Sequence, residues 1–458
     1  MRQIVRYLYC TAVAMLLMTS CSHKKDSVLE VIPDDYQMVA NIKLAKLTEE
    51  AGESLNSVLS VEQREMLSQL DEALCLNDLF IAADDFDEPE NEPAAIMAVP
   101  VKDEKALKKA LGNPKSKNGF TVYDAKSRQI AVKDGIAYVV KDDNLSANLR
   151  MIEKNLDECE DNGSMADVKA MKDAFAEGDN FLVLAVSTEN EDNEQKAHGD
   201  KTVTVVKLKF KDKNTIDFDG YAVYSDGTEF TPKVQMTGVS NDALAYAGSN
   251  PLFTAAVGIP GNFDWKYIFK QYNDFIEKFS PKDAIADSDI ALLLPLLKSI
   301  DGTVMLSVSA KGNITDMAFN VPNITCLVQC KAGTERMLLN MIKMSFKKEM
   351  QIDLNLNDDL TPAATTFKDF TVYVGAIDNN VIISTTPPAK SDNKLATAFK
   401  GQQLGFVLDL PPLGQIMPPL DTPVNLSMLS DGKTLSGNLT CTDKPVMQVL
   451  CELLALVI

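Results

Sequence analysis

The chain contains very little histidine and tryptophan, and it lacks the motifs of the common catalytic sites. Only two of its 458 residues are His, and only one is Trp. His23 and His198 both lie in polar surroundings, which disfavours a Ser-His-Asp or Cys-His site. There is no H-E-x-x-H, no paired C-x-x-C, no glycine-rich phosphate loop and no G-x-S-x-G. We therefore predict no catalytic residue, no bound metal and no cofactor.

Positive charge is also scarce. The sequence has 45 Lys and Arg against 65 Asp and Glu, for a formal net charge of −20. Such an acidic chain repels nucleic acid, so we predict no nucleic-acid partner. With 65 Asp and Glu residues, the sequence does not exclude a pair of catalytic carboxyl groups like that of glycoside hydrolases. The densest run, residues 84–92, has oxygen ligands that Ca²⁺ prefers, but it lacks the EF-hand spacing and is better interpreted as a solvated loop.

No apolar run in the chain is long enough to cross a bilayer. The N-terminal segment has Arg2 and Arg6 and then an apolar run over residues 7–18, whereas a spanning helix needs ~20 residues. A basic start, a short apolar middle and small residues before a cleavage point are typical of a secretory signal peptide. We therefore expect residues 1–20 to be removed.

The end of this segment, Leu-Leu-Met-Thr-Ser-Cys at residues 16–21, resembles the lipobox of bacterial lipoproteins. In that motif the Cys becomes the lipidated first residue, and Met18 stands where Leu is usual. The resemblance implies several acyl chains on Cys21, enough to anchor the protein stably in a membrane. The alternative is a plain signal peptide with an ordinary thiol at Cys21. In bacterial lipoproteins, an Asp directly after the lipidated Cys retains the protein at the inner membrane. This chain has Ser22 at that position, which favours the outer membrane. The side of that membrane on which the protein lies stays open.

Residues 21–27 form a short polar tether between the anchor and the folded body. Asp26-Ser27-Val28 resembles the short acceptor for O-glycans in Bacteroides-type envelope proteins, so Ser27 is a candidate O-glycosylation site. A glycan on an exposed tether would not disturb a core.

Six cysteines remain in the body beyond Cys21, and they are scattered. Cys326 and Cys330 lie four residues apart in an expected strand, which separates them by ~13 Å on one face. That distance exceeds the ~7 Å limit for a disulfide, so we interpret the thiols as small buried apolar groups. One long-range disulfide among the six stays open.

With 45% hydrophobic residues, the body can form a substantial core. Residues 28–140 show strands and helices in the order β-α-β-β-α-β with an added strand, which is the order of a ferredoxin-like sheet. We therefore predict an α+β fold, with a first repeat over residues 28–240 and a second over residues 241–458.

Three sequence matches favour a tandem duplication. Phe-Thr-Val-Tyr at residues 120–123 recurs at 370–373. Ala-Phe followed by Gly and an apolar strand occurs at Ala174 and again at Ala398, and Ser-Asp-Gly occurs at 225–227 and 430–432. Each half should then carry a ferredoxin-like sheet with further antiparallel strands and helices.

Two apolar features could be either core or interaction surface. Residues 446–458 are apolar except for Gln448 and Glu452, and we favour a buried closing helix over a partner surface. Trp265 falls on the apolar side of an expected helix, so we favour a core position over a sugar-stacking platform.

Together, Cys21, the tether, Val-Ile-Pro-Asp at residues 31–34 and Val-Ala-Asn-Ile-Lys-Leu at 39–44 resemble a family of Bacteroidota lipoproteins with a domain of unknown function. The resemblance implies an envelope location and two related α+β halves. We expect a non-catalytic lipoprotein that binds or scaffolds a peptide, a glycan or an envelope protein. A carboxylate-based hydrolase acting on envelope glycans or peptides is the alternative, and a purely structural spacer is the third.

Overall fold

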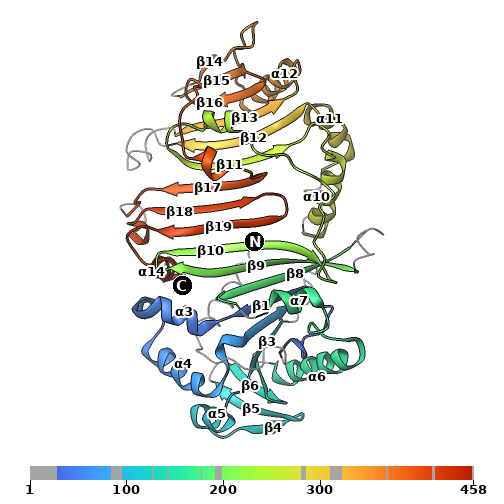
Figure 1. Cartoon of the computed structure of the whole chain (residues 1–458), viewed down its shortest axis with the longest axis vertical. Helices are drawn as coiled ribbons and strands as arrows, with labels where there is room; N and C mark the ends of the chain where they lie inside the picture. The colour runs from blue at the N-terminus through green and yellow to red at the C-terminus, as the bar shows by residue number, and fades with distance from the viewer. Residues whose placement is uncertain are drawn as a thin grey trace. The chain divides into compact units, whose positions relative to one another are not determined.

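The computed structural model describes residues 28–83, 95–125, 128–141, 144–176, 178–190, 199–279, 285–309, 322–367, 370–414 and 418–455. The chain divides into two compact units. The first comprises residues 1–230 with 444–458, and the second comprises residues 231–443. Each unit is a mixture of helices with antiparallel strands, so the predicted α+β class is confirmed (Figure 1).

In the first unit, every described strand pair is antiparallel. The pairings give the strand order β10-β9-β8-β1-β2-β3-β7-β6-β5-β4. The strands are β1 (Met38–Ile42), β2 (Leu79–Ala83), β3 (Ala95–Pro100), β4 (Lys115–Lys117), β5 (Phe120–Ala125), β6 (Arg128–Lys133), β7 (Ile136–Lys141), β8 (Leu182–Glu189), β9 (Lys201–Asp212) and β10 (Thr215–Tyr224). The helices are α3 (Leu44–Ala51), η1 (Gly52–Ser57), α4 (Val61–Ala73), η2 (Leu76–Asp78), α5 (Glu104–Leu111), α6 (Leu145–Asn162), α7 (Lys169–Ala174) and α14 (Val446–Ala455).

The second unit is built in the same way, and its order is β19-β18-β17-β11-β12-β13-β16-β15-β14. Its strands are β11 (Pro251–Ile259), β12 (Ile300–Ser309), β13 (Asn323–Cys330), β14 (Ala363–Phe367), β15 (Phe370–Ile377), β16 (Asn380–Ser384), β17 (Leu404–Leu410), β18 (Val424–Ser430) and β19 (Thr434–Cys441). Its helices are α9 (Asn241–Leu244), η4 (Ala245–Ala247), α10 (Trp265–Phe279), α11 (Asp287–Leu297), α12 (Glu335–Ser345), the π-helix η7 (Phe346–Met350), α13 (Leu395–Ala398) and η8 (Pro418–Leu420).

The two strand orders correspond strand by strand. β1 takes the place of β11, β2 of β12, β3 of β13, β7 of β16, and β8–β10 of β17–β19. Helices join the first two strands in both units, and one helix follows the third strand, α5 in the first unit and α12 in the second. Within the described residues, β4 is the strand without a counterpart. The units therefore share one topology.

The ferredoxin-like order is not what the sheets show. A split β-α-β unit leaves the width of one strand between the two strands that its helix joins. Here β1 and β2 pair directly, with Met38 opposite Ala83 and Ile42 opposite Leu79. The helical connection thus returns the chain to the adjacent position instead of crossing over a neighbour.

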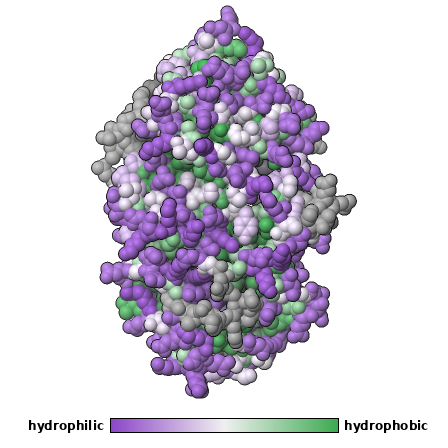
Figure 2. Space-filling view, viewed as in Figure 1, coloured by the Kyte–Doolittle hydropathy of each residue, from purple (hydrophilic) through white to green (hydrophobic). Residues whose placement is uncertain are grey.

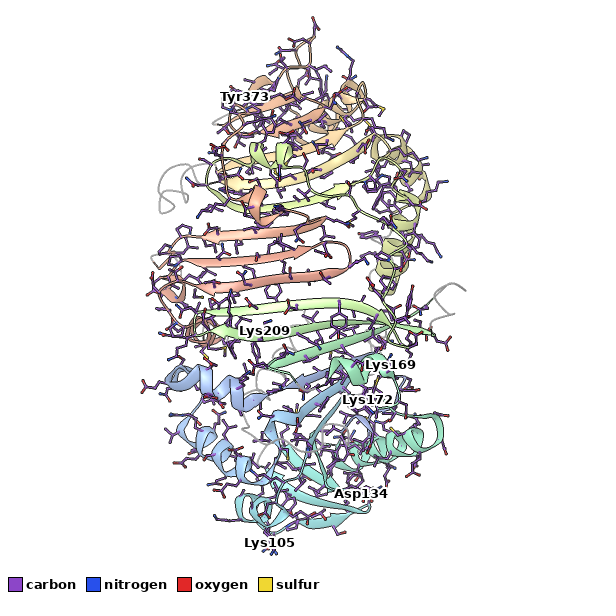
Figure 3. All side chains as sticks on the ribbon, in the orientation of Figure 1. Lys105, Asp134, Lys169, Lys172, Lys209 and Tyr373 are labelled. Atoms are coloured by element: carbon purple, nitrogen blue, oxygen red, sulfur yellow. The ribbon has the colours of Figure 1, made fainter. Side chains whose placement is uncertain are left out.

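Two of the three sequence matches fall on positions that do not correspond. Residues 120–123 lie on β5, whereas residues 370–373 lie on β15, the counterpart of β6; Tyr373 is labelled in Figure 3. Residues 225–227 follow β10, whereas residues 430–432 form the turn between β18 and β19. Ala174 and Ala398 do correspond, because each ends the short helix before β8 or β17. Alternating strands and Asp-Gly turns recur in any chain of hairpins, so they identify hairpins but not their register.

Helix ends follow the local signals in the sequence. The Ser60 hydroxyl accepts from Gln63 N–H at 3.2 Å, and the Gln63 side chain accepts from Ser60 N–H at 2.8 Å, forming a capping box at the start of α4. The Asp103 carboxylate caps α5 by accepting from the Lys105 and Ala106 N–H groups, and Gly112, with φ of +86°, ends the helix. These caps fix where the helices of the first unit leave its sheet.

Equivalent hairpins of the two units have the same turn. Asp134, which is labelled in Figure 3, lies with Gly135 between β6 and β7. Their φ angles are 51° and 79°. Asp378 and Asn379, between β15 and β16, have φ of 51° and 61°. A two-residue type I′ turn requires positive φ at both positions, which Gly adopts freely and Asn tolerates.

Replacing Gly135 with Ala should lower the free energy of unfolding by about 1 kcal/mol, because a side chain is strained at positive φ. Asn379→Gly should have the opposite sign. Gly238→Ala is the matched control, since Gly238 has no positive φ and a Cβ there meets nothing within 4 Å. Urea denaturation measures all three. Equal effects of Gly135→Ala and Gly238→Ala would contradict the turn assignment.

The C-terminal helix α14 belongs to the first unit, although the sequence placed it in the second repeat. It packs against α3 and η1, and Val446 N–H donates to the Lys213 carbonyl in the β9–β10 turn at 2.9 Å. Val446, Val449 and Cys451 are buried. The segment is therefore a closing helix whose inner side is buried, while Leu454 and Ala455 at its end are exposed.

A carboxylate at Val449 should destabilise the first unit by ~3 kcal/mol or more, because it buries a charge without a partner. Leu454→Asp, on the same helix but 39% exposed, should change stability by less than ~0.5 kcal/mol. Urea denaturation of the full chain measures both. If Val449→Asp were as stable as Leu454→Asp, α14 would not be part of the core.

Candidate functional site

Strands β11, β12 and β13 of the second unit have one largely buried face. Along β11, Thr254, Ala256 and Gly258 are buried, while the residues between them are partly exposed. The buried face includes an apolar row, formed by Ala256, Met305 and their neighbours across the sheet, which packs under α9, η4 and α13. This face is closed to ligands.

The same buried face carries a row of hydroxyl groups. Thr254, Ser307, Thr325 and Ser384 are successive register partners across β11, β12, β13 and β16, and all are 9% exposed or less. The Thr254 and Ser307 oxygens are 3.0 Å apart, and those of Thr325 and Ser384 are 3.1 Å apart. Ser307 also donates to the Ala247 carbonyl at 3.0 Å. The hydroxyls satisfy one another and the covering backbone, so they can be buried at little cost.

The opposite side of this sheet, which we call the apolar face, consists of three register rows. The residues are Leu439, Leu426, Leu408, Phe253, Val308 and Ile324 in the first row; Gly437, Met428, Phe406, Ala255, Leu306 and Cys326 in the second; and Leu435, Ser430, Leu404, Val257, Val304 and Val328 in the third.

None of these residues is charged, and none is buried. All are partly exposed, and Leu306, in the middle row, is 41% exposed. The open face of a half-solvated antiparallel sheet is normally polar. An uncharged, largely apolar face that is only partly covered is typical of a surface that binds an apolar ligand. In the view of Figure 2, hydrophilic side chains dominate and hydrophobic ones reach the surface in scattered patches.

The helices that join β11 to β12, and their counterparts in the first unit, differ in their described core contacts. In the described residues, neither α10 nor α11 contributes a side chain to the two hydrophobic clusters of this unit. In the first unit, the corresponding connection supplies Leu44, Leu59 and Leu67, among others, to a fully buried cluster. Among the described residues, the same topological position therefore supplies core side chains in the first unit and none to the clusters of the second.

Helix α10 presents aromatic side chains that are only partly covered. Trp265, Ile268 and Phe269 are partly exposed, and Tyr272 is 42% exposed. Trp265 lies edge-on to Phe263, with 4.8 Å between ring centroids. The prediction that Trp265 is a core residue is thus not what the described clusters show. Figure 1 shows α10 and α11 together beside the ends of β11 and β12.

The described carboxyl groups with shifted pKa values are shifted downwards. Hydrogen bonding to Lys46 lowers the pKa of Asp179, and hydrogen bonds from Thr361 and Thr434 lower those of Asp359 and Asp431. A glycosidase-type general acid needs a carboxyl whose pKa is raised. These three groups are ionised turn and loop carboxylates, and they give the hydrolase alternative no general acid.

The cysteines behave as apolar groups. All six described cysteines are free thiols, as the spacing of Cys326 and Cys330 predicted for that pair. Burial, aided by Asp34 and Asp35, raises the pKa of Cys159 to about 12, and burial raises that of Cys451 to about 11. Thiols with such pKa values are protonated and poorly nucleophilic at neutral pH.

The raised pKa of Cys159 predicts a loss of stability in alkali. Between about pH 9 and 12 the folded chain keeps a thiol proton that the unfolded chain has released, so the free energy of unfolding falls as pH rises. Urea denaturation from pH 8 to pH 10.5 should show a shallower fall for Cys159→Ala than for the natural chain. Identical slopes would show that Cys159 titrates alike in both states.

Several sequence-predicted positions lie outside the described residues. These are Cys21, Ser27, both histidines and the acidic run at 84–92. In the part that is described, no group of three or more His, Cys, Asp and Glu side chains is placed to hold a metal ion. No helix there combines the length and hydropathy that crossing a bilayer requires.

Comparisons with known proteins give no close relative. No protein-family model matches the chain, and no curated protein matches it. A solved chain from Eubacterium rectale, described as a putative DNA polymerase III beta subunit, is 9% identical. It covers 88% of this chain and 98% of its own, with a TM-score of 0.10. A likeness at that level carries no argument about function.

Proposed function

We propose that this chain is a lipid-anchored protein of the bacterial cell envelope that binds acyl chains, without catalysis, on the apolar face of its second unit. The observation that carries the proposal is the inverted polarity of the sheet. Its hydroxyl row is buried, whereas the opposite side, all apolar except Gly437 and Ser430, stays partly exposed. Covering that surface with hydrocarbon is favourable by about 25 cal/mol for each Å² removed from water.

The chemistry of the apolar face favours hydrocarbon over an extended peptide. Strands β11, β12, β13, β17 and β18 are each paired on both sides, so their backbone groups are already used. A peptide lying on the face would bury N–H and C=O groups against side chains that offer almost no hydrogen-bond partner. An acyl chain has no such groups, so its burial leaves no backbone hydrogen bond unmade.

The anchor at Cys21 places the protein beside a source of acyl chains. The basic start, the apolar run and the lipobox-like residues 16–21 support export and lipidation. Ser22 after the Cys supports the outer membrane as the destination, and Ser27 is the candidate glycan site of the tether. These features agree with the resemblance to Bacteroidota lipoproteins.

The shared topology supports an origin by tandem duplication. Strand-by-strand correspondence over nine strands is stronger support than the short sequence matches, because it includes the connections as well. We infer that one copy closed its core with α3, α4 and α14, while the other kept its sheet face open for a ligand.

The proposal is tested with a fluorescent fatty-acid analogue titrated into the full chain. Saturable binding, competed by unlabelled palmitate or by phosphatidylglycerol, is expected, and the better competitor identifies the lipid class. Leu306→Lys, which places a charge in the middle row, should weaken binding more than tenfold, or about 1.4 kcal/mol.

Val61→Lys is the matched control, because Val61 is a surface residue of α4 in the first unit and is 61% exposed. It should bind like the natural chain. Both variants replace exposed side chains, so both should keep the natural thermal midpoint. Binding by Leu306→Lys at the natural affinity would contradict the proposal, as would competition by an amphipathic helical peptide but not by lipid.

A further inference from the structure

Helix α12 of the second unit is apolar on two opposite sides. Its inner side, with Leu338, Leu339 and Ile342, packs in the core against β15 and β16. Its outer side has methionines at Met337, Met341 and Met344, spaced i, i+4 and i+7 and so aligned on one helical face. We call these three, together with Met350 of η7, the methionine ridge.

The methionine ridge is among the most exposed apolar features of the described residues. Met344 is 70% exposed, Met350 is 57% and Met337 is 39%, while Met341 is partly exposed. Unbranched thioether side chains adapt to irregular or mobile partners, and methionine is common at such contact surfaces. A core function does not explain this ridge, because the inner side of the helix already supplies the core.

The ridge ends in a π-helical turn, η7, which Gln351 terminates with φ of 59°. π-helical turns are rare in proteins, and many of those that occur lie at functional sites. The turn carries Lys347, Lys348 and Met350 outward, all of them exposed.

Cations flank the ridge on a chain that is otherwise strongly acidic. Arg336, Lys343 and Lys347 share one side of the helix, and Lys348 follows. Lys343 and Lys347 lie 3.5 and 3.8 Å from Asp353, and Lys348 lies 3.2 Å from Glu349.

These exposed pairs are weak and easily exchanged for other anions. Residues 335–353 carry four cations against three anions, whereas the whole chain has a formal charge of −20. An anionic partner would therefore not be repelled by this surface, although the chain as a whole is acidic.

The corresponding helix of the first unit provides an internal comparison. Helix α5 also carries three lysines, Lys105, Lys108 and Lys109, but it has no methionine, and its Leu107 is buried. Exposed lysines are thus shared by the two helices, while the exposed apolar ridge belongs to α12 alone.

We propose that the methionine ridge inserts into the interface of an anionic phospholipid bilayer, with Lys347 and Lys348 at the level of the phosphates. An amphipathic surface helix with apolar residues outward and basic residues beside them binds a membrane by buried apolar area and electrostatic attraction. The ridge is the outer side of a surface helix, which suits insertion into headgroups, whereas a protein partner would have to supply a groove. This contact is independent of acyl-chain binding on the apolar face.

The test uses the single tryptophan of the chain. Trp265→Phe with Met344→Trp leaves one reporter, at the most exposed position of the ridge, in the full-length protein. On vesicles containing phosphatidylglycerol, the emission of this reporter should shift to the blue and be quenched by brominated acyl chains, and less so on phosphatidylcholine alone. The control, Trp265→Phe with Val61→Trp, places the reporter at an exposed site of α4 and should show neither change.

Charge reversal separates lipid contact from a structural effect. Lys347→Glu with Lys348→Glu, added to the Met344→Trp variant, should reduce quenching several-fold, whereas Lys108→Glu with Lys109→Glu on α5 should leave it unchanged. Equal quenching of the reporters at positions 344 and 61, or an unquenched reporter at position 344 on anionic vesicles, would overturn the proposal. The proposal would also be overturned if an acidic protein from envelope extracts, and not vesicles, shifted the emission of the position-344 reporter to the blue.

Discussion

The burial of a row of hydroxyl groups determines which side of the second unit's sheet faces outward. Thr254, Ser307, Thr325 and Ser384 face the covering helices, where they bond one another and the Ala247 carbonyl. Because side chains alternate along a strand, burying this row turns Leu306 and its neighbours outward. Burying a hydroxyl group costs little free energy when the group is hydrogen-bonded. The hydrogen bonds of this row therefore allow the apolar side chains to lie on the opposite side of the sheet.

The first unit shows what the same topology does when its core is closed. There, α3 and α4 bring leucines into a buried cluster, and α14 returns from the end of the chain to pack on α3 and η1. The second unit keeps the connecting helices α10 and α11 but, in its described residues, not their core contacts. The comparison of two units with one strand order is what makes the partly exposed apolar face of the second unit notable.

Much of the local structure could be predicted from sequence, because it depends on neighbouring residues. The capping box at Ser60, the cap at Asp103 and the buried C-terminal helix all follow from short patterns. The order of the strands in the sheet could not be predicted in this way. Whether β1 and β2 are neighbours depends on the path of the helical segment that joins them, and no sequence motif specifies that path. The candidate site was missed for a related reason. Along β12, Val304 and Leu306 alternate with Met305 and Ser307, so the pattern does not tell which side is covered, and the structure buries Met305 and Ser307.

If the apolar face binds acyl chains, the protein should leave the cell envelope with lipid bound to its second unit. Native mass spectrometry of the full protein, released gently from the envelope, measures this. We expect a mass above that of the polypeptide with its covalent modifications, and the excess should leave as intact lipid on mild activation. A protein that carries only its covalent mass, with its second unit equally stable with and without added lipid, would contradict acyl-chain binding.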